Sequence, residues 1–430
     1  MNPFTPLLFF FGKDMSRHII LLSGIAVIAW FMTLSGVVWG GYLLWISLIL
    51  IATLIIWRAG DFFSPAATYI QNKHDIPQSI KAAVIDAIAS SFPEFCVAII
   101  AVILIATLII WRAGDFFSPA ATYIQNKHDI PQSIKAAVID AIASSFPEFC
   151  VAIIAVILIG RAEVGISTIV GSALYNVLVI PAAAGLVAAS PMVISREVVW
   201  RDNIYYLGVT LLLGAMLWMF PNEWGAGVAV IFLLAYLGYV FLLHRDFKNS
   251  KKQSADFKKT DILETKTEDD DELELTSEKK AWMWVAGMMI VMGGASHLLV
   301  EASLALGDML GIDAVIMGFV VIAAGTSVPD TALSVISAKK GNYDAAVSNI
   351  FGSNIFDICI CLSIPILLAL AISGEATAIE LPQLGLIWSL IGATFLAVYF
   401  FWSNNYTLTK LKAGMMGFLY LLIILISFSF

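Results

Sequence analysis

The sequence predicts an all-α polytopic membrane protein: two inverted five-helix repeats (ten core transmembrane helices), an N-terminal helix, and an extra span from a tandem duplication. Three observations predict this fold. The 430-residue chain is 60% hydrophobic and 13% charged, whereas soluble domains are about 45–50% apolar and about 25% charged. Apolar stretches of roughly 20 residues, long enough to cross a bilayer, recur along it. Two of these stretches carry the same proline–acid motif, each followed at nearly the same spacing by a second shared motif.

The composition excludes several classes of protein. A mean hydropathy of +0.89 is incompatible with a soluble enzyme, a nucleic-acid binder or a disordered scaffold. The net charge of −8 at pH 7 argues against polyanionic partners, so we expect no nucleic acid. All four cysteines lie in apolar runs, which predicts no disulfide framework.

The chain divides into two apolar groups around one hydrophilic segment. We expect an N-terminal helix in 1–40, a first repeat domain at 41–243, a cytosolic linker at 244–279 and a second repeat domain at 280–430. The linker carries lysine pairs and an acidic run, which indicates a mobile, solvated segment; a Ca²⁺-sensing or partner-binding loop remains an alternative. The expected spans are 19–38, 41–57, 84–111, 134–159, 165–189, 203–220, 224–243, 280–306, 312–338, 346–373, 383–402 and 412–430.

A 54-residue block occurs twice in tandem. Residues 52–105 recur without change at 106–159, so the chain would have 376 residues with one copy. With the N-terminus in the cytosol and span 84–111 set aside, nearly all loop Lys and Arg residues fall on the cytosolic side, as the positive-inside rule requires. Counting 84–111 as one further crossing inverts this bias. The extra block therefore either crosses twice, lies as a re-entrant segment, or is an artefact of the sequence.

Each domain carries the same two motifs in the same order. The first reads SSFPE at 144–148 and GSALYN at 171–176, and the second reads TSVPD at 326–330 and GSNIFD at 352–357. Such agreement indicates an internal repeat. Five spans per domain is an odd number, so the two repeats must point opposite ways. Inverted repeats with sites near the midplane are common among secondary transporters.

The proline–acid motifs place charge deep inside two spans. A carboxylate at the bilayer centre costs on the order of 2.5–3.5 kcal/mol on insertion scales, so Glu148 and Asp330 are seldom there without a role. Proline before each acid removes a helical hydrogen bond and frees a carbonyl one turn earlier. Hydroxyls three and four residues before each acid share its helix face. These hydroxyl residues are Ser144 and Ser145 in the first motif and Thr326 and Ser327 in the second.

The second motifs add further oxygen donors. Ser172 and Asn176 are four residues apart, as are Ser353 and Asp357, so each pair shares a helix face. Such all-oxygen clusters suit Ca²⁺ and also Na⁺, and disfavour zinc, copper and iron. The three acids could hold one divalent ion or several monovalent ions but not both, which is the basis of exchange. Alternatives are a simple kink with a snorkelling acid, serines bonded to the preceding turn, and an Asn176 that only bonds across helices.

These residues resemble a known family. GTSVPD and GSNIFD at 325–330 and 352–357, with VGISTIVGSALYN at 164–176, resemble the α-repeats of the calcium/cation antiporter superfamily, above all the K⁺-dependent Na⁺/Ca²⁺ exchangers and their prokaryotic relatives. The resemblance implies ten core helices and Ca²⁺ export driven by Na⁺ entry. The first motif departs from the family, with Ala143 and Phe146 where glycine and a small residue are usual.

The resemblance also implies roles for individual residues. Glu148 and Asp330 match paired Ca²⁺-binding acids, and Asn176 and Asp357 match the last ligand pair; an Asp at the latter place is associated with K⁺ dependence. Positions that lend backbone carbonyls are Ser144 and Thr326. Positions that lend Na⁺-site hydroxyls are Ser145, Ser172, Ser327 and Ser353.

The sequence therefore predicts a secondary active cation antiporter, not an enzyme, that exchanges Na⁺ for Ca²⁺ by alternating access, with K⁺ dependence left open. An H⁺-coupled exchanger of Ca²⁺ or another divalent ion is the alternative, and a product impaired by the duplication is a third. We expect no cofactor, a multi-pass location in the plasma or bacterial inner membrane, and the bilayer, Ca²⁺ and Na⁺ as partners. Function is assigned to Glu148 and not to its copy Glu94, because only Glu148 runs directly into the span at 165–189.

Overall fold

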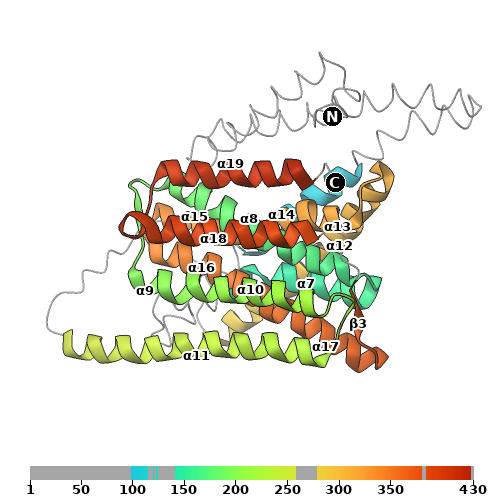
Figure 1. The fold of residues 1–430 in the computed structure, drawn as a ribbon, viewed down its shortest axis with the longest axis horizontal. Coiled ribbons are helices and arrows are strands. Elements are labelled where there is room, and N and C mark those ends of the chain that lie inside the picture. Colours follow the sequence, from blue (N-terminus) through green and yellow to red (C-terminus); the bar gives the residue numbers. More distant parts are fainter. Residues whose placement is uncertain are drawn as a thin grey trace, which may run out of the picture. The chain divides into compact units, whose positions relative to one another are not determined.

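The fold is taken from a computed structural model that describes most of the chain beyond residue 97. The described residues are 98–114, Ala120, Tyr123, 141–257, 278–379 and 384–427. The chain forms two compact units, Met1–Val102 and Ile103–Phe428, and the labelled helices and strands of Figure 1 belong to the second. The predicted spans 19–38 and 41–57 and residues 258–277 of the linker lie outside the described residues.

The described part of the chain is mostly helical. An apolar helix covers Ala98–Gly114. The elements that fall in the predicted first repeat domain, called the first domain below, are α6 (Ala141–Ser144), α7 (Phe146–Ile153), η3 (Ile154–Ile159), α8 (Ala162–Val187), β1 (Met192–Val193), α9 (Arg196–Val198), η4 (Val199–Asn203), α10 (Ile204–Met219), β2 (Glu223–Trp224) and α11 (Ala226–Phe257). The η segments are π-helical turns.

The second domain continues the same way. Its elements are α12 (Glu278–Leu310), α13 (Ala314–Met317), η5 (Gly318–Ile322), α14 (Ala323–Thr326), α15 (Val328–Lys339), α16 (Tyr343–Phe356), η6 (Asp357–Cys361), α17 (Leu362–Ser373), β3 (Thr377–Ala378), α18 (Leu384–Tyr406), β4 (Thr407–Leu408) and α19 (Lys410–Ser427). Six described helices are long and apolar enough to cross a membrane, or seven with the bent pair Ala314–Thr326 and Val328–Lys339.

Helices coincide with the predicted spans to within a few residues wherever the chain is described from 141 onward. One difference is α11, which continues to Phe257, well into the segment predicted as linker. Residues 244–257 contain neither Gly nor Pro, so nothing in their backbone chemistry ends the helix where the apolar run stops. Hydropathy marks the end of the apolar span, not the end of the helix.

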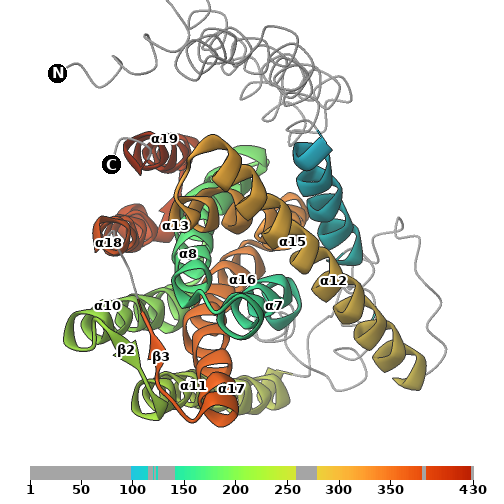
Figure 2. The same cartoon turned by 90° about the vertical axis from the view of Figure 1, so that its right-hand side faces the viewer.

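Helix α8 is the centre of the second unit. It packs against α7, α15, α16, α18 and α19, and Figure 2 shows it surrounded by other helices. In its most apolar stretch, 89% of the residues are buried. An apolar helix in a membrane need not be enclosed by other helices, and the apolar span of α19 is only 17% buried. The enclosure of α8 therefore comes from its packing, and α8 carries one of the two second motifs into that interior.

Small residues let backbones approach closely around α8. A Cβ added at Gly171 would collide with the backbone of Phe319 in η5, and one added at Gly318 would collide with the Ser167 hydroxyl. Close approach at small residues is how helices associate in lipid, where hydrophobic driving force is absent. These glycines therefore fix the spacing between the helices that carry the two motif pairs.

Two short ribbons join loops of the first domain to loops of the second. β1 pairs with β4, with Met192 opposite Leu408, and β2 pairs with β3, with Glu223 opposite Ala378. Both pairs are antiparallel. Figure 1 places β3 at one end of the helices and the α18–α19 turn, which contains β4, at the other. Each end thus has a ribbon that joins the two predicted repeat domains.

A buried ion pair ties three helices together near the start of α10. The Asp202 carboxylate, fully buried, accepts bonds from Arg201 Nε at 2.6 Å and Nη2 at 2.8 Å, from Ser348 Oγ at 2.7 Å and from Tyr239 Oη at 3.0 Å. These donors lie in η4, α16 and α11. The carboxylate has four donors, which is the condition under which a buried charge is tolerated.

Substituting Asp202 with Ala is expected to destabilise the folded protein by about 3–5 kcal/mol, because it removes the buried carboxylate that lies closest to the largely buried Arg201 guanidinium. The readout is the melting temperature of purified protein in detergent. Asp246→Ala is the matched control: Asp246 is 34% exposed and 3.7 Å from Arg201, so its loss should cost at most about 1 kcal/mol. Equal melting temperatures for the two variants would contradict the role given to Asp202.

Candidate functional site

Both proline–acid motifs break their helices at the same place. The first breaks at Ser145 (φ −86°, ψ 1°) between α6 and α7, and the second at Ser327 (φ −78°, ψ 3°) between α14 and α15. In both, proline stands in the first turn of the new helix, where its fixed φ fits and its missing N–H is not needed. The segments on either side of Ser327 are bent by 44°. The sequence prediction of a proline break inside each span agrees with this geometry.

The Glu148 carboxylate lies at the start of α7 and is fully buried. Its Oε1 accepts hydrogen bonds from Ser172 Oγ of α8 at 3.2 Å and from Ser327 Oγ at 3.4 Å. The two hydroxyls are also 2.9 Å from each other, and the Thr326 side chain interacts with the same carboxylate. The first acid is therefore surrounded by one hydroxyl of its own domain and two of the other.

The Asp330 carboxylate has a matching environment. Its Oδ2 accepts bonds from Ser353 Oγ of α16 at 2.8 Å and from Asn176 Nδ2 of α8 at 3.0 Å. The Ser353 hydroxyl lies 2.5 Å from that of Ser145, and the Ser144 side chain interacts with the acid. All of these residues are buried.

The third acid, Asp357, stands where α16 passes into the wider turn η6. It is fully buried, and its Oδ1 lies 3.7 Å from Cys361 Sγ, one turn later. The Ser145 side chain also interacts with its carboxylate. The ten predicted site residues thus lie in one buried network that joins the two domains.

Five buried side-chain oxygens of this network have no hydrogen-bond donor among the residues that the structure describes. They are Glu148 Oε2, Asp330 Oδ1, Asp357 Oδ2, Asn176 Oδ1 and Asn349 Oδ1. Leaving a buried acceptor unsatisfied costs about 1–3 kcal/mol, and more if it is charged. Acceptors gathered without donors are the arrangement that a bound cation satisfies.

No three His, Cys, Asp or Glu side chains among the described residues form a ready-made metal cluster. Hydroxyl and amide oxygens would therefore have to complete any ion shell. The described cysteines, Cys150, Cys359 and Cys361, are all free, and Cys96 lies outside the described residues.

Two asparagines that the sequence reading did not select belong to the network. Asn354 accepts from Asn176 Nδ2 at 3.0 Å and donates to the Ala173 carbonyl at 3.2 Å, joining α16 to α8. Asn349 donates to Ser334 Oγ at 3.1 Å. Asn349 lies four residues before Ser353, which is itself four before Asp357, so a polar face of period four was the signal that could have found it.

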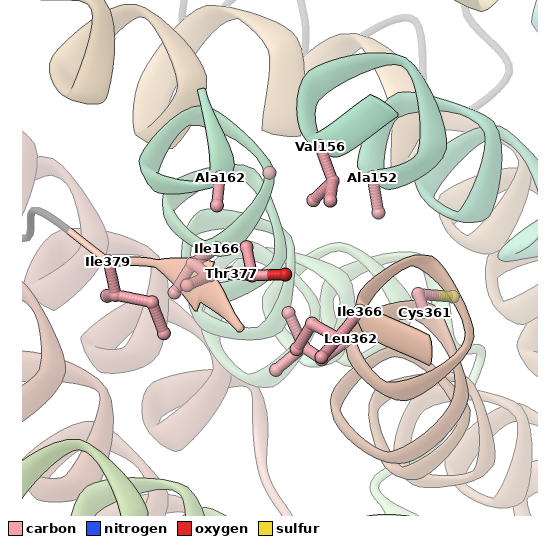
Figure 3. A pocket seen from close by; sticks show the side chains of 10 residues that line it. Ala152, Val156, Ala162, Ile166, Cys361, Leu362, Ile366, Thr377 and Ile379 are labelled. Atoms are coloured by element: carbon pink, nitrogen blue, oxygen red, sulfur yellow. The ribbon is translucent and has the colours of Figure 1, made fainter. Parts of the chain in front are cut away.

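An apolar pocket lies among α7, η3, α8, η6, α17 and β3. Figure 3 shows Ala152, Cys361 and Thr377 among its lining side chains. Ala152 is one turn beyond Glu148 and Cys361 one turn beyond Asp357, but neither carboxylate lines the pocket. The Thr377 hydroxyl, buried as an atom, has no hydrogen-bond partner in the described part of the chain.

Comparison with known families identifies the chain. The sequence model of the family described as sodium/calcium exchanger protein matches residues 44–104, 99–244 and 280–429, which is more than half of the chain. The chain belongs to this family. Membership places it in the calcium/cation antiporter superfamily, as the motifs predict, and makes it a multi-pass membrane protein. The first two matched stretches each contain all or nearly all of one copy of the repeated block.

Individual members of the family agree with this assignment. The chain is 28% identical over 268 residues to the inner membrane protein YrbG of Escherichia coli (strain K12), covering 62% of this chain and 79% of the relative. It is 27% identical over 383 residues to human sodium/potassium/calcium exchanger 5, covering 69% and 75%. Its fold is similar to that of the sodium-calcium exchanger NCX_Mj, with a TM-score of 0.54 at 18% identity over 76% of this chain and 97% of the other.

Proposed function

We propose that this protein is a secondary active antiporter that exchanges Na⁺ for Ca²⁺ across a membrane by alternating access. The observation that carries the proposal is the group of five buried oxygens without donors, three of them on carboxylates. Hard oxygen ligands of this kind suit Ca²⁺, which takes 6–8 of them, and Na⁺. The named activities of relatives such as the human sodium/potassium/calcium exchanger 5 support the same pair of ions.

Charge explains why binding of the two ions would be mutually exclusive. Three ionised carboxylates carry −3 in a site without a single buried cationic side chain among the network residues. One Ca²⁺ or several Na⁺ ions would neutralise this charge, but both together would leave like charges crowded in a low-dielectric interior. The surrounding serine hydroxyls each have acceptor lone pairs, so they can turn from a carboxylate to an ion. Exchange follows because one ion must leave before the other binds.

We also propose that the core is two inverted repeats of five helices. Two pairings support this. Glu148 bonds Ser172 of its own domain, which contacts Ser327 of the other, and Asp330 bonds Ser353, which contacts Ser145. In each case a serine beside the acid of one domain contacts the serine of the proline–acid motif in the other domain. Such reciprocal contacts are expected of a two-fold axis in the membrane plane.

The ribbons support the same axis. β1 follows α8 and pairs with the α18–α19 turn, and β3 follows α17 and pairs with the α10–α11 turn. If the two domains are related by a two-fold axis, the β1–β4 ribbon is therefore the equivalent of the β3–β2 ribbon. Rocking of such repeats about a fixed central site is the usual means of alternating access, and the breaks at Ser145 and Ser327 supply points at which α7 and α15 can tilt.

The test is ⁴⁵Ca²⁺ uptake into proteoliposomes loaded with Na⁺. We expect uptake to follow an outward Na⁺ gradient and to stop when a Na⁺ ionophore dissipates it. Uptake driven by a pH gradient without Na⁺ would contradict the proposal and favour the H⁺-coupled alternative. Replacing K⁺ by choline in the same assay measures whether K⁺ is co-transported, a role that would fall to Asp357.

A chain that lacks residues 52–105 is the control for the duplication. Because the described site uses only residues from the second copy onward, the full chain and the shortened chain should both transport. Transport by the shortened chain alone would support the impaired-product alternative.

A further inference from the structure

The helix Ala98–Gly114 is built across the junction of the two copies of the repeated block. Its residues up to Ile105 end the first copy and those from Ala106 begin the second. We call it the seam helix, and we call two residues twins when they occupy the same position in the two copies. Before Gly114 the seam helix contains neither Gly nor Pro, so it crosses the junction without a break.

The second-copy half of the seam helix lies along the break of the second motif. A Cβ on Gly114 would be 3.3 Å from the Cβ of Pro329, and a Cβ on Gly325 would be 3.0 Å from Thr107 Oγ1. Both of these distances are shorter than ordinary van der Waals contact, so the backbones at these two points lie very close to their neighbours. The seam helix therefore packs against α14 just before the break at Ser327 and against Pro329 just after it.

The buried face of the seam helix has helical spacing. Ile99, Ile103, Ala106, Ile110 and Ala113 are at most 8% exposed and lie four, three, four and three residues apart, on one side of a helix. Three of the five come from the second copy. The buried face thus continues across the junction, and its part beside the second motif comes from the second copy.

We infer that residues 106–114 of the second copy, and not their twins 52–60, supply the part of the seam helix that contacts the second motif, so that the core begins at the seam helix. The inference rests on the proposed ten-helix core. Residues 52–60 and 106–114 are identical, so their own sequence cannot decide which of them takes the place next to Pro329. Gly114 occupies that place, at a separation that leaves no room for a second helix.

Chain connectivity gives the physical reason. The second-copy segment is joined to α6 by residues 115–140, whereas its twin segment would have to span a further complete copy before reaching α6. Closing a longer loop costs more entropy. Of the two identical segments, the second-copy segment is closer along the chain to the helices of the core, so its contact with them costs less conformational entropy.

Disulfide cross-linking in the full chain tests this. The Gly114→Cys and Pro329→Cys pair places two Cβ atoms within a few tenths of an ångström of the range that a disulfide requires, about 3.5–4.5 Å. The four native cysteines are replaced by Ala and a protease site is inserted in the linker. After cleavage, the two halves should stay together on a non-reducing gel and separate on reduction.

The twin pair, Gly60→Cys with Pro329→Cys, is the matched control and should leave the halves separate. Cross-linking of the Gly60 pair at an equal or higher yield would overturn the inference, as would failure of the Gly114 pair in protein that remains monodisperse. Neither readout involves transport, so failure of the inference and failure of the proposed function remain distinguishable.

A steric pair of variants covers the case in which the cysteine variants do not fold. Gly114→Trp should abolish the monodisperse peak in fluorescence size-exclusion chromatography, because Pro329 and Met292 are already within 3.8 Å of an added Cβ. Gly60→Trp should leave the peak unchanged. Equal effects of the two variants, or the reverse order, would overturn the inference.

Discussion

Glu148→Gln and Asp330→Asn are each expected to lower Na⁺-driven ⁴⁵Ca²⁺ uptake by more than about 100-fold. Each change keeps the shape of the side chain and removes a charge whose free oxygen, Glu148 Oε2 or Asp330 Oδ1, has no donor in the described network. Loss of an outer-shell partner alone typically costs about 10–100-fold in metal affinity, so loss of a charged ligand should cost more. Initial rates in proteoliposomes, corrected for the amount of protein, give the measurement.

The chain carries its own control for this experiment. Glu94 is the twin of Glu148 with an identical local sequence, and Glu94→Gln should transport at nearly the normal rate. Because the two acid variants remove a buried charge, they should remain folded and monodisperse. Loss of transport in Glu94→Gln, or normal transport in Glu148→Gln, would show that the site had been assigned to the wrong copy.

Gly171→Val is expected to prevent assembly of a stable protein. An added Cβ at Gly171 would collide with backbone atoms of Phe319, which cannot move as a flexible side chain can. Ordinary overpacking costs about 1–3 kcal/mol, and this case also forces apart the helices that carry the two motif pairs. Fluorescence size-exclusion chromatography of detergent extracts should show the monodisperse peak reduced to background.

Gly208→Val in α10 is the matched control, because an added Cβ there meets no atom within 4 Å. It introduces the same β-branched side chain into an apolar helix and should keep the normal peak. A normal peak for Gly171→Val would mean that α8 and η5 are not in the close contact that the structure gives them.

Much of the candidate site could be predicted from local sequence. Glu148 and Asp330 stand out because a carboxylate after proline inside an apolar stretch is costly, and Ser172 and Asp357 follow from helical spacing. The contacts of Asn354 and Asn349 could not be predicted in the same way. Their partners lie on other helices, and a side chain's partner across a helix interface depends on packing that no short stretch of sequence encodes.

The boundaries of the helices show the same division. The spans from 165 onward were predictable to within a few residues because span length follows from bilayer thickness. The continuation of α11 to Phe257 was not, since a helix can extend into water beyond the apolar stretch.

By itself, the sequence determined that the chain is a membrane protein in which an oxygen-rich pair of motifs recurs. Composition, apolar length and motif spacing are local properties that can be read along the chain. Only the tertiary structure decided that the hydroxyls beside one acid contact the hydroxyls of the other motif pair, and that the helix at Ala98–Gly114 covers the second motif. Two identical copies have identical local preferences, so the choice between them depends on connectivity and packing across the whole fold.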